Sequence, residues 1–346
     1  MSDDALGACM PKPNGSPETA ATTNDLTEIT VVGADRTGIV AEVTGLLFEH
    51  GVNVEDIEQT VRDGVFRMTL LADTSPIDDA DDRWEAEDEA EPADLAGDAT
   101  TRAAFRERLA DIGDQLGVDV RVRFPDERDE GVAVLVTKED HCLRALLDAD
   151  FDAEVRVVIG NHPDLESVAR EHDVPFYDVG DGTGTPDEER LLDLLDEYDV
   201  DLVVLARYMR ILSPDVVFRY AGRIINIHPS LLPAFPGAQA YRQAVEEGVR
   251  VAGVTAHYVT TDLDQGPILT QRAFDVPPTA TVQNVKDRGQ PLEADALVEA
   301  VRVHLAGDAT VRRGSVEVTG DHQFGMPDEA SAANPDRPVD APPADD

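Results

Sequence analysis

The sequence predicts an α/β protein with two structured parts: an N-terminal ferredoxin-like unit of order βαββαβ, then a doubly wound, mostly parallel sheet. The N-terminal region alternates strand-like and helical segments in that order, and Asp63-Gly64 between two of its strands is a strong hairpin signal. Beyond residue 130, short apolar runs alternate with amphipathic helical segments over short connections, which is the pattern of a parallel sheet. The length of 346 residues allows two or three domains.

The N-terminal part begins after a polar arm, residues 1–25, which we expect to be disordered. Residues 26–124 form the predicted ferredoxin-like unit, interrupted by an acidic insertion at 75–98 that contains little apolar sequence. Its elements are expected in this order: strand 28–32, helix 39–49, strands 52–62 and 65–72, helix 101–116 and strand 118–124.

A charged linker, residues 125–130, precedes the second part, residues 131–320, and residues 321–346 form an acidic tail that we expect to be disordered. The strands of the second part are predicted at 132–136, 155–159, 175–179, 201–206 and 223–227, with another strand-like run at 251–259. Helices are predicted at 142–147, 165–169, 188–198 and 214–220, and a closing helix within 279–304.

Acidic residues dominate the composition. Asp and Glu number 71 against 29 Lys and Arg, a formal net charge of −42, and only three lysines occur. The negative electrostatic potential of such a chain repels nucleic acid and anionic membranes, so neither is expected as a partner. The acids are spread along the chain, which argues against an acidic interaction tail, and apolar periodicity persists, which argues against wholesale disorder. We therefore interpret the charge as adaptation to a salt-rich cytoplasm.

Targeting and cross-linking signals are weak. The N-terminus has neither a basic segment nor an apolar core typical of a signal peptide, and apolar runs fall short of the roughly 18 residues of a membrane span. We therefore expect a cytoplasmic protein. Cys9 and Cys142 are far apart in sequence and predict neither a disulfide framework nor a metal cluster.

Polar groups follow apolar strands between residues 224 and 268. Asn226 and His228 share one face of a predicted strand, because side chains alternate with period two. An amide donor and a histidine can hold an oxyanion and relay protons, and Asp264 can act as a base or hold water. His257 has the same spacing to Thr255 on the next strand. Spacing alone also fits structural roles: Asn-x-His is often structural in a strand, and Asp264 can be a turn residue.

Two motifs in the N-terminal part carry a resemblance. Asp35-Arg36-Thr37-Gly38-Ile39 and Gly51-Val52-Asn53-Val54 resemble the corresponding turns of ACT domains. The resemblance implies a small-molecule effector, such as an amino acid, near Asp35, Gly38 and Asn53, and pairing of chains into a homo-oligomer. Alternatively, Gly38 only makes the turn.

The second part also carries a resemblance. The runs from Asn226 to Gly237 and from Asp264 to Ile268 resemble formyltransferases that use 10-formyltetrahydrofolate, over residues 131–307. The resemblance implies catalytic roles for Asn226, His228 and Asp264. It also implies substrate-binding roles for Met209, Arg210, Ile211, Leu212, Gly237 and His257. It implies folate as substrate and no permanently bound cofactor or metal.

Within that superfamily, the chain resembles the formyltetrahydrofolate deformylase family, in which an ACT domain precedes the catalytic domain. The resemblance implies hydrolysis of 10-formyltetrahydrofolate to formate and tetrahydrofolate, in the context of purine and one-carbon metabolism. The segment 137–141 lacks the glycines that a phosphate cradle needs, which disfavours a phosphorylated acceptor. The run Pro229-Ser230-Leu231-Leu232 is closer to transferases, so formyl transfer to glycinamide ribonucleotide stays an alternative. A non-catalytic regulator that binds folate or an amino acid is a second one.

Overall fold

The computed structural model describes residues 26–77, 101–125, 131–312 and 314–319. The chain divides into two compact units, Met1–Arg128 and Asp129–Asp346, and the division falls within the predicted linker at 125–130. The predicted arm at 1–25 and tail at 321–346 lie outside the described residues, as does most of the predicted insertion at 75–98. Each unit is described by itself.

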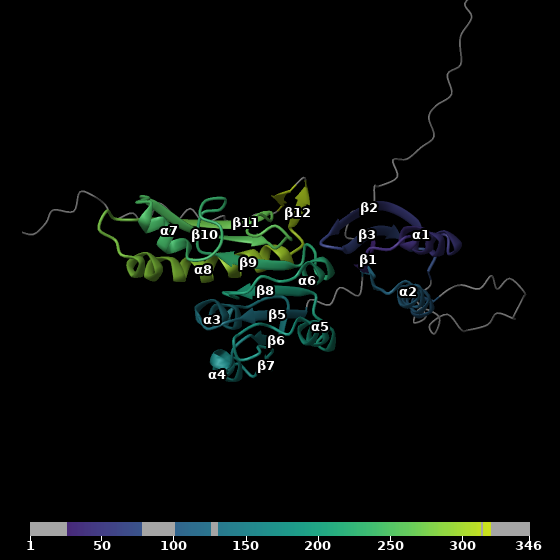
Figure 1. The fold of residues 1–346 in the computed structure, drawn as a ribbon, viewed down its shortest axis with the longest axis horizontal. Coiled ribbons are helices and arrows are strands. Elements are labelled where there is room, and N and C mark those ends of the chain that lie inside the picture. Colours follow the sequence, from purple (N-terminus) through teal and green to yellow (C-terminus); the bar gives the residue numbers. More distant parts are fainter. Residues whose placement is uncertain (1–25, 78–100, 126–130, 313, 320–346) are drawn as a thin grey trace, which may run out of the picture. The chain divides into compact units, whose positions relative to one another are not determined.

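The first unit is an antiparallel sheet with the strand order β2-β3-β1-β4 (Figure 1). Its elements are β1 (Thr27–Ala34), α1 (Ile39–Glu49), β2 (Asn53–Arg62), β3 (Val65–Asp73), α2 (Arg102–Leu116) and β4 (Val118–Arg123). This sequence of elements confirms the predicted βαββαβ order. Asp63 and Gly64 have φ values of 51° and 82° between β2 and β3, as a two-residue hairpin turn requires.

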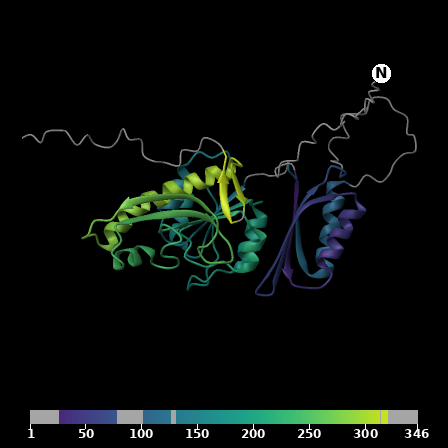
Figure 2. The same ribbon diagram turned by 90° about the horizontal axis from the view of Figure 1, so that it is seen from above.

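Both helices of this unit pack on one face of its sheet (Figure 2). The core joins apolar positions of α1 and α2, such as Val43 and Phe105, to alternate strand residues such as Ile29 and Met68. Period-two alternation in the strands and helical spacing in α1 and α2 therefore meet in one core.

The second unit contains a seven-stranded sheet of order β11-β10-β9-β8-β5-β6-β7. Its strands are β5 (Gly131–Val136), β6 (Glu154–Gly160), β7 (Phe176–Asp178), β8 (Leu202–Ala206), β9 (Ile224–His228), β10 (Val251–Tyr258) and β11 (Ile268–Asp275). Strands β9, β8, β5, β6 and β7 are parallel, whereas β10 and β11 are antiparallel to their neighbours. The predicted doubly wound, mostly parallel sheet is confirmed.

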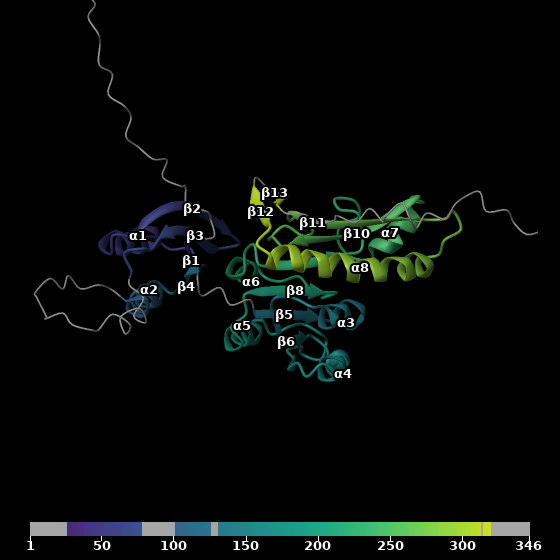
Figure 3. The same cartoon turned by 180° about the vertical axis from the view of Figure 1, so that it is seen from behind.

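Helices cover both faces of this sheet. They are α3 (His141–Asp148), α4 (Glu166–Glu171), α5 (Glu188–Glu197), α6 (Pro214–Arg219), α7 (Ala240–Glu246) and α8 (Val282–Leu305). Helices α3, α4 and α8 share one core with alternate strand residues such as Val134 and Val204, and α5 and α6 share the other with Ala133 and Val203. The long α8 runs lengthwise beside the strands in the view from behind (Figure 3).

Several elements lie outside the sequence predictions: α7, β11 and the hairpin of β12 (Ala309–Arg312) and β13 (Ser315–Val318). Among the described residues, the helices are too short or too polar to cross a lipid bilayer.

The arrangement that matters for chemistry is the adjacency of β9, β8 and β5. Because these strands are parallel neighbours, the segments that follow their carboxyl ends gather at one edge of the sheet.

Candidate active site

A cavity of about 560 Å³ lies at this edge of the sheet. Residues at or just after the carboxyl ends of β5, β8 and β9 line it, together with parts of β10, α7, the turn before β11 and the start of α8. All nine residues predicted for catalysis or substrate binding line the cavity: Met209, Arg210, Ile211, Leu212, Asn226, His228, Gly237, His257 and Asp264. The fold thus brings together positions from Met209 to Asp264, which come from separate elements of the sequence.

Asn226 lies opposite His257 in the antiparallel pair of β9 and β10. Its Nδ2 is 3.2 Å from His257 Nε2, and His257 Nδ1 is 2.9 Å from the carbonyl oxygen of Tyr258. A carbonyl only accepts, so Nδ1 of His257 carries a proton and donates it, and Nε2 of the neutral ring accepts from Asn226. Burial lowers the pKa of His257, although the Tyr258 carbonyl and Asp264 act in the opposite direction. A neutral histidine therefore fixes the orientation of the Asn226 amide.

His228 is buried between two oxygen atoms. Its Nε2 donates to the Phe235 carbonyl at 2.9 Å, and its Nδ1 is 3.4 Å from Asp264 Oδ2. The same carboxylate oxygen accepts from the Gly237 N–H at 2.6 Å. Asp264 therefore connects the turn that carries it to the loop after β9, and it places a carboxylate beside the imidazole, as proton relay requires.

Backbone geometry holds Asp264 in this position. Asp264 itself has a φ of 53°, and Gly266 lies so close to Tyr258 that a Cβ there would be 1.7 Å from the Tyr258 carbonyl oxygen. Only glycine allows this approach. The segment 264–266 is thus pressed against the end of β10, next to His257.

The segment after β8 forms one wall of the cavity. Met209 and Ile211 are exposed apolar side chains at 51% and 74%, whereas Leu212 is buried. Met209 N donates to Thr137 Oγ1 at 2.9 Å, and the Arg210 guanidinium donates to the carbonyl oxygens of Thr183 and Gly184. A fixed backbone with exposed apolar side chains suits a flat aromatic ligand.

A network of charged residues lies beside this wall, and sequence reasoning missed it. Glu293, on α8, is completely buried, with carboxylate oxygens 3.2 Å from Arg207 Nε, 3.2 Å from His141 Nε2 and 2.5 Å from Tyr241 Oη. Glu139 lies 3.1 Å from the same Arg207 Nε. A buried charge needs a partner, so an acid within the apolar pattern of α8 was the available signal.

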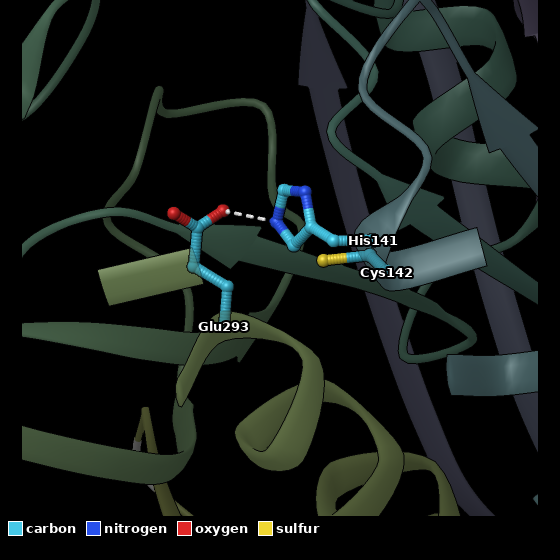
Figure 4. Close-up of side chains that lie close together, drawn as sticks. All are labelled: His141, Cys142 and Glu293. Carbon is cyan, nitrogen blue, oxygen red and sulfur yellow. Dashed lines mark hydrogen bonds and ion pairs between the residues drawn. The ribbon is translucent and has the colours of Figure 1, made fainter. Parts of the chain in front are cut away.

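His141, Cys142 and Glu293 lie close together, with donor atoms within 4.8 Å of one another (Figure 4). Burial raises the pKa of the Cys142 thiol well above its usual range, which disfavours the thiolate that binds metals. The Arg207 guanidinium already forms an ion pair with Glu293. The arrangement therefore favours an ion-pair network here. That no metal is needed stays a prediction.

The residues predicted to bind an effector lie in the first unit. Gly38 has a φ of 99° at the start of α1, and a Cβ there would have open space around it, so the backbone conformation alone accounts for a glycine. Asn53 Nδ2 donates to the Glu55 carboxylate, and Asp35 N donates to the Gly64 carbonyl. These contacts leave an effector-binding role as a prediction.

Comparison with known proteins agrees with this architecture. The family model for formyl transferases matches residues 130–301, and that for ACT domains matches residues 28–90. A formyltetrahydrofolate deformylase of Bacillus subtilis (strain 168) is 35% identical over 280 residues, which covers 78% of this chain and 86% of that protein.

Solved structures match either most of this chain or only about half of it. A formyltetrahydrofolate deformylase from Pseudomonas syringae pv. tomato aligns with a TM-score of 0.54 and 31% identity, over 85% of this chain and 94% of its own. Glycinamide ribonucleotide transformylase 1 from Symbiobacterium toebii aligns with a TM-score of 0.52 and 36% identity, but over only 55% of this chain and 94% of its own. The deformylases thus match both units, and the predicted family is confirmed. The chain belongs to the formyltetrahydrofolate deformylase family.

Proposed function

We propose that the chain hydrolyses 10-formyltetrahydrofolate to formate and tetrahydrofolate. The observation that supports this best is the set of Asn226, His228 and Asp264 around one cavity, with His228 Nδ1 3.4 Å from the Asp264 carboxylate. An amide donor, an imidazole and a carboxylate are what addition of water to a formyl group needs. The names of the relatives support the choice of substrate.

In the proposed reaction, the pteridine ring lies along the wall formed by Met209–Leu212. Asn226 donates an N–H to the formyl oxygen, and that oxygen replaces the Phe235 carbonyl as the partner of His228 Nε2. Asp264 accepts a proton from the attacking water, whose oxygen bonds to the formyl carbon. The bond from carbon to N10 then breaks, N10 receives a proton through His228, and formate leaves. These steps use side chains alone and no permanently bound cofactor.

The test is formate release in the absence of any amine. Brisk release from 10-formyltetrahydrofolate, with tetrahydrofolate formed in equal amount, supports hydrolysis. Transfer to glycinamide ribonucleotide is the second candidate, because a transformylase is 36% identical over 55% of this chain and Pro229-Ser230-Leu231-Leu232 is transferase-like. Product that forms only when that amine is added would favour transfer.

We further propose that the first unit binds an amino acid and that the protein is a homo-oligomer. The ACT match at residues 28–90 supports both. Titration calorimetry with glycine and methionine tests the first proposal, and light scattering tests the second. Heat from neither amino acid, or the scattering mass of a single chain, would contradict them.

We also propose a cytoplasmic location with abundant salt, and formate supply to purine synthesis as the metabolic context. The net charge of −42 supports the salt-rich environment, because counterions must screen its self-repulsion. Fractionation of cells tests the location.

A further inference from the structure

The Glu139 carboxylate lies between two cationic side chains on the wall of the active-site cavity. Its Oε2 is 3.1 Å from Arg207 Nε and its Oε1 is 2.5 Å from Lys286 Nζ, and all three residues line the cavity. Glu139 follows β5, Arg207 follows β8 and Lys286 lies near the start of α8. Three elements thus converge on one carboxylate.

The two cations differ in their other partners. The Nε of Arg207 that donates to Glu139 also forms an ion pair with the buried Glu293 at 3.2 Å, and Arg207 has a φ of 62°, which is unusual for a residue other than glycine. Lys286 forms an ion pair with Glu139. Burial would raise the pKa of Glu139, but hydrogen bonds from Lys286 and Arg207 outweigh it, so the carboxyl group is held ionised. Without Glu139, the Lys286 ammonium group and the Arg207 Nε, which would keep its ion pair with Glu293, would have no carboxylate between them on the cavity wall.

A guanidinium and an ammonium that both reach the oxygens of one carboxylate can likewise both reach the oxygens of one phosphate group, an anion that such side chains bind. Phosphate sites at this edge of a parallel sheet are usually formed by glycine-rich backbone, which the segment 137–141 lacks. The cations are present, but their position for an anion is filled by a side chain of the protein itself.

We propose that Glu139 determines the acceptor: its carboxylate occupies the place of an anionic group between Arg207 and Lys286, and so keeps phosphorylated amines out of the cavity and leaves the formyl group to water. This inference rests on the proposed hydrolytic function. Glu139 acts on what enters the cavity rather than on the reacting atoms.

The test is titration calorimetry of inorganic phosphate against the full chain without folate. Glu139→Ala opens the space and removes the charge, and Glu139→Gln removes the charge alone. Asp140→Asn is the matched control, because it removes the neighbouring charge, whose partner is Arg144. We expect phosphate to bind Glu139→Ala roughly tenfold or more tightly than wild type, as repulsion by one nearby carboxylate implies, and Asp140→Asn to bind as wild type does.

A further variant, Glu139→Ala with Lys286→Met, separates a site from a general change of charge. It should lose the added phosphate affinity. Affinity of Glu139→Ala within about twofold of wild type, or equal gains in Asp140→Asn, would overturn the proposal, provided that circular dichroism shows each variant folded. The readout is phosphate binding, so a failure of formate release would contradict the proposed function without affecting this result.

Discussion

Asn226 is held by a partner that stays neutral. The Nε2 of His257 accepts from the Asn226 amide while Nδ1 donates to the Tyr258 carbonyl, so the amide cannot rotate without losing its partner. A donor that is oriented before substrate arrives stabilises a developing oxyanion without reorganisation. His257 is thus a positioning residue for Asn226.

The titration of His257 predicts a loss of stability in mild acid. Burial lowers the pKa of His257 in the fold from the ordinary value of 6.5, so below pH 6.5 the unfolded chain binds a proton that the folded chain does not. The contribution of the neutral His257 to the free energy of unfolding is therefore fully present above pH 6.5. It is lost as the pH falls from 6.5 toward the lower pKa that His257 has in the folded protein. His257→Gln keeps an acceptor for Asn226 and does not titrate. Urea unfolding about one unit above and below pH 6.5 should show a smaller loss of unfolding free energy in His257→Gln than in wild type. Equal losses of unfolding free energy in wild type and His257→Gln would contradict a lowered pKa of His257 in the fold.

Glu293 is the residue on which the buried ion-pair network depends. Glu293→Gln keeps the volume but leaves Arg207 with Glu139 as its remaining anionic partner, and removing one member of a buried pair costs about 3–5 kcal/mol. We expect that loss in the free energy of unfolding by urea. Asp287→Asn, an exposed position on the same helix, should stay within about 0.5 kcal/mol of wild type. A Glu293→Gln protein as stable as the control would contradict the role of the network.

At the scale of elements, the turn between β10 and β11 sets the place of Asp264. A Cβ at Gly266 would collide with the Tyr258 carbonyl, so Gly266→Ala must displace the turn. Because a shift of about 1 Å in a catalytic group can cost about 10²-fold in rate, we expect activity to fall by about that factor in a folded protein. Gly45→Ala, at an open position in α1, is the control and should keep full activity. An active Gly266→Ala enzyme would show that the close approach is not required.

The sequence predicted those elements whose signal is local. Strand β8 and helix α5 were found because apolar runs and helical spacing fix them. Helix α7 was missed because it is only seven residues long and begins after Gln239, whose φ of 62° gives no sequence signal. The catalytic set rested on motifs, whereas the partners of Glu293 come from three distant segments, so tertiary contacts alone identify them.

At the scale of the whole molecule, the net charge of −42 predicts that salt stabilises the protein. Raising the ionic strength from about 0.1 M to about 1 M shortens the screening length from about 10 Å to about 3 Å, which weakens repulsion between surface carboxylates. The melting temperature should therefore rise with potassium chloride. Calorimetry in matched buffers checks this, and a melting temperature that is constant or falls with salt would contradict adaptation to a salt-rich cytoplasm.

The central claim is that water accepts the formyl group, and isotope incorporation tests it most directly. The protein is incubated with 10-formyltetrahydrofolate in ¹⁸O-labelled water, with concentrated potassium chloride and no amine, and the formate is analysed by mass spectrometry. We predict formate that carries one labelled oxygen, released about 10²–10³-fold more slowly by Asn226→Ala, which lacks the oxyanion donor. No labelled formate without an amine, and a formylated product once glycinamide ribonucleotide is added, would contradict the account.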